Sequence, residues 1–378
     1  MAKRQRGNGE GSITQRLDGR WMARISLGGY GKTRRVDTLY GATRDEVAKA
    51  LTKTLRDKDT GKTLGRKAPT LATFANTWLT GAAAALKPST HDFYRDHLDH
   101  HVLPLLGRHR MDSIRRRHVV ALIRASRQKG LKVNTVRGIV RTLSVVLSEA
   151  VEQEHLDSNP ALNVRKHLRQ GSEAVPEPDP FTAEEAHLFA ETARQSFARW
   201  YPLVLCGLRT GMRLGELLGL EWGDIDWRAR AIRVSRSYVR GRIGSPKNHQ
   251  RRTVDLSPQL RGVLRLYRRQ LRATFLANGL PRPEILFPSD EGTRLDDSNV
   301  RKVFTRICEQ AELAHRSPHD MRHTYASLLL SAGAPLLYVS AQLGHANSTI
   351  TLKTYAKWMP KTDARAHSAM LDDTRKVA

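Results

Sequence analysis

Two stretches that cannot build a core divide this 378-residue chain into three parts. The first, "TGKTLGRKAPT" (60–70), mixes Gly, Lys and Pro, and the second, "NVRKHLRQGSEAVPEPDP" (163–180), is rich in proline and charge. A chain of this length exceeds one ordinary core, so two or three domains are expected. We therefore predict three domains and a linker at 166–180; the domains comprise residues 1–62, 68–165 and 181–378.

The first part has the pattern of a small antiparallel sheet followed by a helix. Apolar residues at 21, 23, 25 and 27 alternate with Arg20, Met22, Arg24 and Ser26 between glycine-containing turns, which predicts two or three short strands with one buried face. "TRDEVAKALTKTLRDK" (43–58) predicts a helix capped by Thr43, with Glu46 three residues on. Arg24 and Arg35 would lie on the open face and contact a DNA groove; alternatively, such arginines form only a solvated face.

The second part has helical periodicity from Thr70 to Leu156. Four apolar-periodic segments predict an all-helical bundle. The third and fourth segments carry arginines between their apolar residues, which predicts basic outer faces. Arg124, Arg137 and Arg141 are therefore candidate DNA contacts.

The third part predicts a mixed but mostly helical domain. The expected helices are at about 182–195, 199–210, 213–220, 258–278, 297–314, 319–332, 335–343 and 347–356. Between them, residues 231–257 predict a β-hairpin with Gly244-Ser245-Pro246 near its turn. The predicted fold class is thus multidomain and mainly α, with a sheet-plus-helix module, a helical bundle and a mostly α domain that contains a hairpin.

Composition limits the partner and the compartment. The net charge of +27 points to a polyanion, most commonly nucleic acid, while 39% hydrophobic residues exclude a basic disordered tail. Cys206 and Cys308 fit reduced, structural thiols. The basic start "MAKRQRGNGE" precedes no apolar segment, and no window is suited to a membrane span. We therefore expect a soluble, cytoplasmic, nucleoid-associated protein with no membrane partner.

Histidines recur at helical spacing in two places, at 97 and 101 and again at 315, 319 and 323. Such spacing can bring two imidazoles to one metal ion. No cysteine pair and no HExxH motif accompanies them. We therefore expect solvated or phosphate-facing histidines and no metal site.

"SPHDMRHTYASLLL" (317–330) concentrates polar chemistry at the start of a predicted helix. His319, Arg322 and His323 cluster on one side, and an anion would bind there beside free backbone N–H groups. The other side carries Met321, Leu328, Leu329 and Tyr325, which predicts that this tyrosine belongs to the core. Alternatively, Arg322 pairs with a carboxylate such as Asp320.

Three other segments supply the remaining groups that phosphoryl transfer without a metal requires. "TGMRLGELLGLEWGDID" (210–226) contributes Arg213 and Glu216, "GSPKNHQRRTVDL" contributes Lys247, and "LGHANSTITLKTYAKW" (343–358) contributes His345 and Tyr355. Guanidiniums can clamp the non-bridging oxygens, and tyrosine can form a reversible phosphate ester. A lysine or histidine can protonate the departing oxygen.

These segments, in this order, resemble the tyrosine recombinases of the phage-integrase family. The resemblance covers about residues 70–360 and implies a helical, SAM-like core-binding domain followed by the catalytic domain. The first 60 or so residues resemble the arm-type DNA-binding domain of many integrases.

The resemblance also implies a role for each site residue. Arg213 and Arg322 would clamp the phosphate, and Lys247 would be the general acid. His319 would assist proton transfer, His345 would hydrogen-bond the scissile phosphate, and Tyr355 would be the nucleophile. Glu216 would support the site structurally.

The function implied is site-specific integration and excision of a mobile element through a 3′-phosphotyrosyl intermediate, without ATP, metal or cofactor. The implied partners are double-stranded DNA attachment sites and three further copies of the chain in a synaptic homotetramer. The sequence leaves open whether a directionality factor or a host DNA-bending protein takes part, and whether the element is a prophage or a conjugative element.

Two other interpretations stay open from the sequence. A chromosome-dimer resolvase or a type IB topoisomerase would use the same chemistry, although a resolvase usually lacks the extra N-terminal module and a topoisomerase lacks the "LGH" pattern. A DNA-binding regulator that has lost catalysis would bind DNA and form no covalent adduct.

Overall fold

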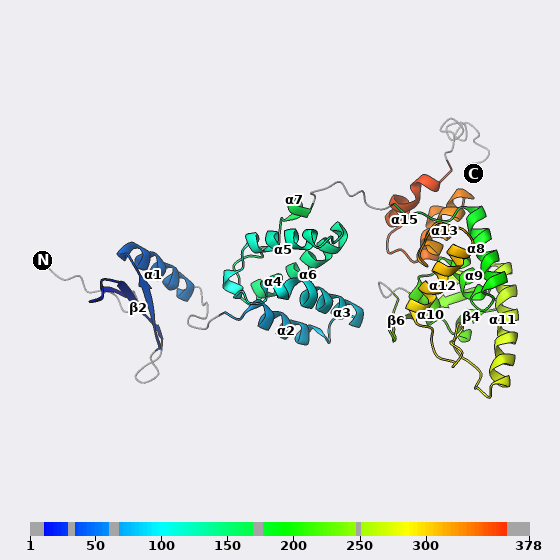
Figure 1. The fold of residues 1–378 in the computed structure, drawn as a ribbon, viewed down its shortest axis with the longest axis horizontal. Helices are drawn as coiled ribbons and strands as arrows, with labels where there is room; N and C mark the ends of the chain where they lie inside the picture. The colour runs from blue at the N-terminus through cyan, green and yellow to red at the C-terminus, as the bar shows by residue number, and fades with distance from the viewer. Residues whose placement is uncertain (1–10, 29–34, 60–67, 169–176, 247–250, 361–378) are drawn as a thin grey trace, which may run out of the picture. The chain divides into compact units, whose positions relative to one another are not determined.

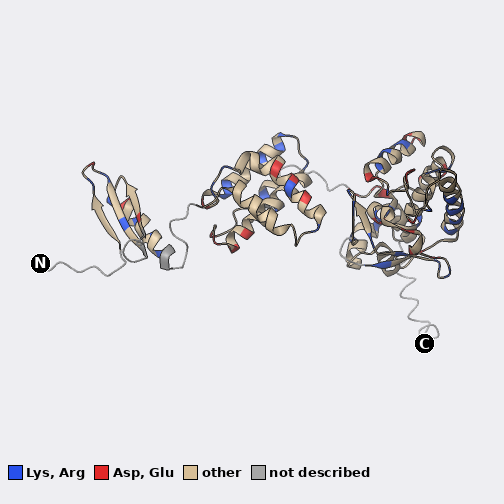
Figure 2. Cartoon of the chain, turned by 90° about the horizontal axis from the view of Figure 1, so that it is seen from below, with Lys and Arg blue, Asp and Glu red and all other residues tan. Residues whose placement is uncertain are grey.

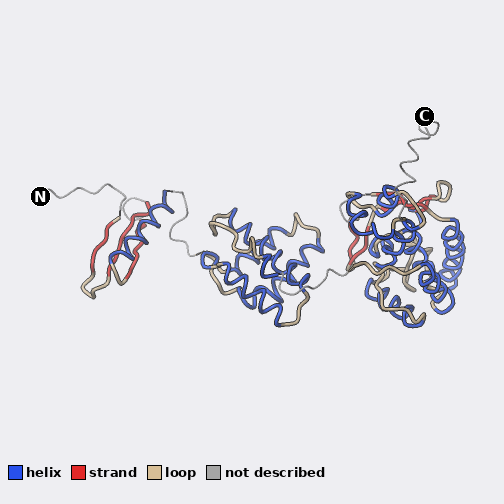
Figure 3. Tube along the Cα trace, turned by 90° about the horizontal axis from the view of Figure 1, so that it is seen from above, coloured by secondary structure: helices blue, strands red, loops and turns tan. Residues whose placement is uncertain are grey.

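The structure is a computed structural model, and it describes residues 11–28, 35–59, 68–168, 177–246 and 251–360 (Figure 1). The chain divides into two compact units between Ala174 and Val175. The first unit holds a sheet-plus-helix module and a helical bundle, and the second holds the mostly helical domain (Figure 3). The predicted fold class is confirmed.

The N-terminal module is a three-stranded antiparallel sheet with one helix. Strands β1 (Ser12–Gln15), β2 (Trp21–Gly28) and β3 (Arg35–Gly41) pair in sequence order, and α1 (Arg44–Asp59) follows. Ala23 and Ile25 of β2 are buried with Val47 and Leu51 of α1. Thr43 Oγ1 accepts from the backbone N–H of Glu46 at 3.3 Å, which confirms the predicted cap.

The two candidate DNA-contacting arginines of this module lie on neighbouring strands. Arg24 is exposed and alternates with the buried residues of β2, so it lies on the face opposite α1. Arg35 begins β3 and pairs with Gly28.

The helical bundle follows the four predicted segments. It consists of α2 (Leu71–Ala82), α3 (Pro88–His97), the π-helical turn η2 (Leu98–Val102), α4 (Leu103–Leu106), the 3₁₀ turn η3 (Met111–Ser113), α5 (Arg116–Gln128), α6 (Val133–Glu152) and the short α7 (Arg165–Leu168). The second predicted helix is thus three consecutive elements. The apolar stripe of α6, which includes Ile139, Leu143 and Leu147, is fully buried at the centre of the bundle.

Helical structure continues to Leu168, which lies within the predicted linker 166–180 and packs against the bundle core. One expectation for this region is wrong. His97 is buried rather than solvated, and its Nδ1 forms a 2.9 Å hydrogen bond with Thr142 Oγ1. Burial is the main cause that lowers the pKa of His97.

The second unit is built around the buried helix α9 (Tyr201–Thr210). The other helical elements are α8 (Ala183–Ser196), α10 (Leu214–Gly219), η4 (Trp222–Asp224), α11 (Pro258–Ala277), α12 (Asp297–Gln310), α13 (Asp320–Ser331), α14 (Leu336–Leu343), α15 (Ser348–Tyr355) and η6 (Ala356–Trp358). Cys206 and Cys308 are free and buried, as expected.

The predicted hairpin is two separate strand pairings. β5 (Ala231–Val234) pairs with both β4 (Ile225–Asp226) and β8 (Arg252–Asp255), while β6 (Ser237–Val239) pairs with β7 (Arg242–Gly244). The tight turn is at Arg240-Gly241, where both φ angles are positive, at 48° and 78°. That conformation matches the twist of a two-residue hairpin loop, so the expected turn near Gly244-Ser245-Pro246 is wrong.

None of the helices in the described ranges combines the length and the apolar character that crossing a membrane requires.

Candidate active site

The predicted site residues come from four segments of the second unit that are distant in sequence. Arg213 precedes α10, Arg322 lies in the first turn of α13, His345 follows α14, and Tyr355 ends α15. The charges of Arg213 and Arg322 act on both His345 and Tyr355, so these four groups share one electrostatic environment. Lys247 lies outside the described residues.

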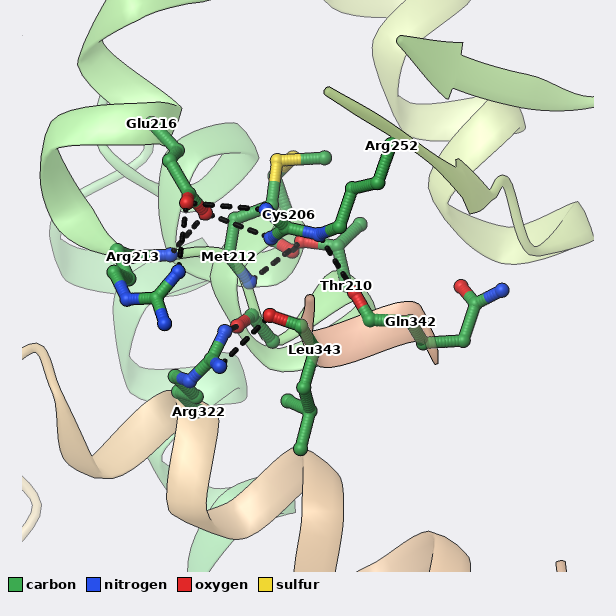
Figure 4. Close-up of polar contacts among 10 residues, drawn as sticks. Cys206, Thr210, Met212, Arg213, Glu216, Arg252, Arg322, Gln342 and Leu343 are labelled. Atoms are coloured by element: carbon green, nitrogen blue, oxygen red, sulfur yellow. Dashed lines mark hydrogen bonds and ion pairs between the residues drawn. The ribbon is translucent and has the colours of Figure 1, made fainter. Parts of the chain in front are cut away.

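Arg322 is a buried cation held by backbone carbonyls. Its guanidinium donates to Gly211 O at 2.9 Å and to Leu343 O at 2.8 Å, and the residue is 2% exposed (Figure 4). Among the described residues, no carboxylate forms an ion pair with it. Burial and the nearby Arg213 lower the pKa of Arg322 to about 9, and the charge of Glu216 only partly opposes this.

Two left-handed glycines make these carbonyls available. Gly211 (φ +59°) ends α9 and Gly344 (φ +65°) ends α14, both as C-caps. A Cβ on Gly211 would lie 2.5 Å from the ring of Tyr325, and one on Gly344 would lie 2.7 Å from Cδ of Arg252. Glycine is therefore required at both positions by backbone conformation and by close packing.

Glu216 connects two arginines beside this cation. Its carboxylate accepts from Arg213 Nη1 at 2.9 Å and from Arg252 Nη1 and Nη2 at 3.0 and 2.7 Å. Figure 4 shows Glu216 lying between the two guanidiniums. The carboxylate is desolvated, which by itself would raise its pKa, but Arg252 and then Arg213 lower the pKa to about 2.

Arg252 belongs to the site and was not predicted from the sequence. Its side chain is 8% exposed, and Nε donates to Gln342 O at 2.8 Å. A signal was present, because Arg252 is two residues before the buried Val254 in β8 and so shares its inward face.

Tyr355 is buried and its hydroxyl is hydrogen-bonded to His323. The residue is 1% exposed, and its hydroxyl lies 2.8 Å from His323 Nδ1. Burial raises the pKa of Tyr355 to about 12, although Arg322 and Arg213 partly oppose this. His323 was predicted to lie on the polar side of its helix and had no assigned role; the structure places it against the hydroxyl of Tyr355.

The other two histidines are held in the neutral form. Burial, followed by the charges of Arg322 and Arg213, lowers the pKa of His345 to about 4, and its Nδ1 lies 2.7 Å from Thr351 Oγ1. His319 is exposed overall, but its ring packs edge to face on that of His323 with centroids 4.8 Å apart. Desolvation on that side and the charge of His323 lower the pKa of His319.

The helix-face prediction for residues 317–330 is confirmed for the core side and wrong in one respect. Tyr325 and Met321 are buried in apolar clusters, as predicted. Arg322 is buried as well, because α14 and the end of α9 cover the side of α13 that was expected to be open. Asp320 accepts from the N–H and hydroxyl of Ser317 instead of pairing with Arg322.

The candidate DNA contacts of the helical bundle are exposed. Arg124 on α5 and Arg137 and Arg141 on α6 face solvent, and no acidic side chain in the described part of the chain pairs with them. Arg137 donates to Asn134 Oδ1 at 3.0 Å. As for metals, the described residues contain no group of three or more His, Cys, Asp or Glu side chains that could hold an ion.

Two matches to known families settle what kind of protein carries this site. Residues 181–361 match the phage integrase family, and residues 71–167 match the phage integrase central domain. The chain belongs to the phage integrase family. It is a site-specific tyrosine recombinase of the integrase type found on mobile elements, and it cleaves and rejoins DNA.

Individual relatives agree with this assignment. A tyrosine recombinase XerC-like protein of Caldanaerobacter subterraneus subsp. tengcongensis is 27% identical over 88% of this chain and 90% of its own length. The integrase of transposon Tn1549, solved with transposon right end DNA, superposes with a TM-score of 0.67 at 20% identity, over 82% of this chain and 100% of that one. The lambda integrase tetramer on a Holliday junction gives a TM-score of 0.62 at 16% identity, over 95% of this chain and 99% of that one.

Proposed function

We propose that Tyr355 is the nucleophile of the recombinase and that Arg213 and Arg322 clamp the scissile phosphate. The hydroxyl oxygen attacks phosphorus, the bond to the 5′-oxygen breaks, and a 3′-phosphotyrosyl link and a free 5′-hydroxyl result. Attack of a 5′-hydroxyl from another strand on this link rejoins the DNA and releases Tyr355. The phosphotyrosyl ester retains the energy of the broken phosphodiester bond, so rejoining the DNA requires no ATP or cofactor.

The burial of Arg322 without an ion-paired carboxylate among the described residues is the observation that supports this proposal most directly. A buried charge that is not ion-paired is costly, and a protein can retain one where a ligand of opposite charge completes the site. Glu216 already bonds to Arg213 and Arg252, so it leaves the positive charge of Arg322 for the phosphate. Charge that develops on the non-bridging oxygens would be stabilised by these fixed donors.

The histidines and Lys247 complete the proposed mechanism. His345 is neutral at physiological pH and can donate a hydrogen bond to a phosphate oxygen. His319 would assist proton transfer, and Lys247 would give a proton to the departing 5′-oxygen. Glu216 would hold Arg213 in position, and Arg252 would in turn hold Glu216.

We further propose that the partners are double-stranded attachment sites and that four copies assemble on two duplexes. This extends to the present chain what the lambda integrase structure displays, a tetramer on a Holliday junction. Exposed Arg24, Arg124, Arg137 and Arg141 support DNA contacts outside the catalytic domain. Binding to an attachment site with each arginine changed to glutamine, tested against salt, would check these contacts.

Covalent capture tests the nucleophile. A nicked suicide duplex taken from the junction that flanks the gene would be labelled at one end and resolved on a denaturing gel. We expect a 3′-linked adduct with the unaltered chain and with Tyr325→Phe, and none with Tyr355→Phe, because the charges of Arg213 and Arg322 act on Tyr355, whereas Tyr325 lies in an apolar cluster. An adduct lost only in Tyr325→Phe would reassign the nucleophile, and tight binding without an adduct across all junction sequences would identify a DNA-binding protein that has lost catalysis.

A further inference from the structure

A second basic surface lies on α11 of the catalytic domain. Residues 258–283 contain six arginines and no acidic residue. Five of the arginines lie on α11 itself and span about 100° of its circumference at 100° per residue. We call these five the α11 stripe: Arg261, Arg265, Arg268, Arg269 and Arg272.

The charge of the α11 stripe is not neutralised by the protein. In the described part of the chain, no Asp or Glu forms an ion pair with any of its arginines. Desolvation, followed by repulsion from Arg272 and Arg282, lowers the pKa of Arg268. The Nε of Arg268 is buried and has no hydrogen-bond partner. A concentration of positive charge without counter-charges is the footprint of a polyanion partner.

Aromatic rings hold part of the stripe in place without removing its charge. The guanidinium of Arg265 lies 5.6 Å from the ring centroid of Trp227, and that of Arg268 lies 5.3 Å from Trp222 and 6.0 Å from Trp227. Such cation–π contacts orient guanidiniums and leave their donors available. Part of the ordering cost of binding is therefore already met in the free protein.

The stripe is separate from the active site. In Figure 1, α11 runs along one edge of the catalytic domain, and α15 and β6 lie at the opposite edge. Figure 2 shows basic residues along that outer helix. Arg265, Arg269 and Arg272 are exposed there, whereas Arg322 of the active site is buried.

We propose that the α11 stripe binds the phosphate backbone of a DNA duplex other than the one held in the active site. From Arg261 to Arg272 the helix rises about 16 Å at 1.5 Å per residue. The three exposed arginines, Arg265, Arg269 and Arg272, lie within about 10 Å of that length. Duplex DNA carries one negative charge per ~1.7 Å of its axis, so several phosphates lie within reach of these side chains. Contacts to the backbone carry no sequence information, so this surface would accept a duplex of any sequence.

Capture of a second duplex tests the inference, which goes beyond the proposed function because it uses no residue of the active site. The full chain with Tyr355→Phe is bound to an immobilised duplex, and a labelled random-sequence duplex is then added over a series of salt concentrations. The stripe variant is Arg265→Gln/Arg269→Gln/Arg272→Gln. The matched control is Arg194→Gln/Arg199→Gln/Arg301→Gln, which removes the same charge from arginines that are ion-paired with Glu191, Asp290 and Asp297.

We expect the stripe variant to capture the second duplex at least ~10-fold less well and the log–log salt slope to fall by about 2 to 3, roughly one unit for each phosphate that is no longer bound. The control should retain capture. Arginine-specific chemical modification read by mass spectrometry should show that the duplex protects Arg269 and Arg272. Unchanged capture by the stripe variant, or an equal loss in both variants, would overturn the inference.

A partner of another class gives a different result. If poly-glutamate protects the stripe and the duplex does not, the surface serves an acidic protein and the inference is wrong. When Tyr355 is retained, the stripe variant should still form the covalent adduct on a suicide duplex. Failure of this inference can therefore be distinguished from failure of the proposed chemistry.

Discussion

The helical bundle and the catalytic domain bury different kinds of polar side chain. In the described bundle, the buried polar residues are His97, Ser126, Thr142 and Asn159, all of which can be neutral. The catalytic domain buries ionised groups, among them Glu216 and Arg322. Burying a charge gives little stability at best, so a domain that does so repeatedly does it for another reason. The catalytic domain therefore bears a cost of burial that the bundle avoids, which is consistent with the proposed role of its buried charges in holding a phosphate.

Two buried arginines of the catalytic domain sharpen this contrast. Arg316 has two carboxylates, Asp179 at 3.2 Å and Glu185 at 3.4 Å, and lies over the ring of Phe181 at 5.0 Å. Arg322 has backbone carbonyls and no carboxylate among the described residues. The first arginine is ion-paired within the fold, whereas the second has no ion-paired carboxylate there, as its proposed role in clamping the phosphate requires.

The largest effect is expected from Glu216→Gln. Removing this carboxylate leaves Arg252 buried without its ion pair and Arg213 without its anchor, which should lower the free energy of unfolding by about 3–5 kcal/mol. Urea unfolding of the catalytic domain in the full chain would measure it. Glu221→Gln is the control, because Glu221 pairs with Arg236 and Arg294 at a more exposed position. Equal losses in both variants would show that burial of the pair is unimportant.

The pH dependence of unfolding tests the same ion pair. The pKa of Glu216 is lowered to about 2 in the folded protein, against an ordinary value of 4.5. Its contribution, about 3 kcal/mol, is therefore complete above pH ~4.5 and is lost as the pH falls toward 2. Glu216→Gln should flatten the stability curve in this window, and a curve that is unchanged would contradict the ion-pair geometry.

The next effect is on catalysis. Arg322→Lys should reduce the single-turnover rate of adduct formation by about 10²–10³-fold, because an ammonium cannot replace the planar guanidinium at both carbonyls and the phosphate. Thermal unfolding would show whether the variant still folds. Arg316→Lys should instead lower stability and leave the adduct rate of the folded protein unchanged. If Arg316→Lys slows the adduct as much as Arg322→Lys does, the distinction between the two arginines fails.

A variant of the bundle core should lose stability and keep its rate of adduct formation. Leu143→Ala removes a fully buried side chain from α6 and should cost about 3 kcal/mol of unfolding free energy. The adduct rate per folded molecule should stay within a few-fold, because no group of the active site changes. Denaturant titration and single-turnover kinetics on the same sample would measure both. A large loss of rate at full folding would mean that the core of the bundle contributes to the chemistry.

Sequence patterns predicted most of the helices and strands, because the spacing of apolar residues shows which face of one element is buried. The same spacing does not show which other segments pack against that face. Tyr325 was assigned to the core by its side of the helix alone, and it is buried. Arg252 and His323 were given no role, since their positions depend on Glu216 and Tyr355, which approach from other segments. Burial of Arg322 was missed for the same reason. The hairpin turn was misplaced because Arg240 adopts a left-handed conformation that sequence preferences disfavour.

The smallest predicted effect concerns the hydrogen bond between the buried side chains of His97 and Thr142 in the bundle. Thr142→Val leaves His97 Nδ1 without its 2.9 Å partner and should cost about 1–2 kcal/mol, because a buried polar atom loses its hydrogen bond without regaining water. Adding His97→Leu should restore part of this stability, since replacing both partners with apolar groups removes the unsatisfied atom. Urea unfolding of the two single variants and the double variant gives the coupling energy. Strictly additive losses would mean that the two side chains do not interact.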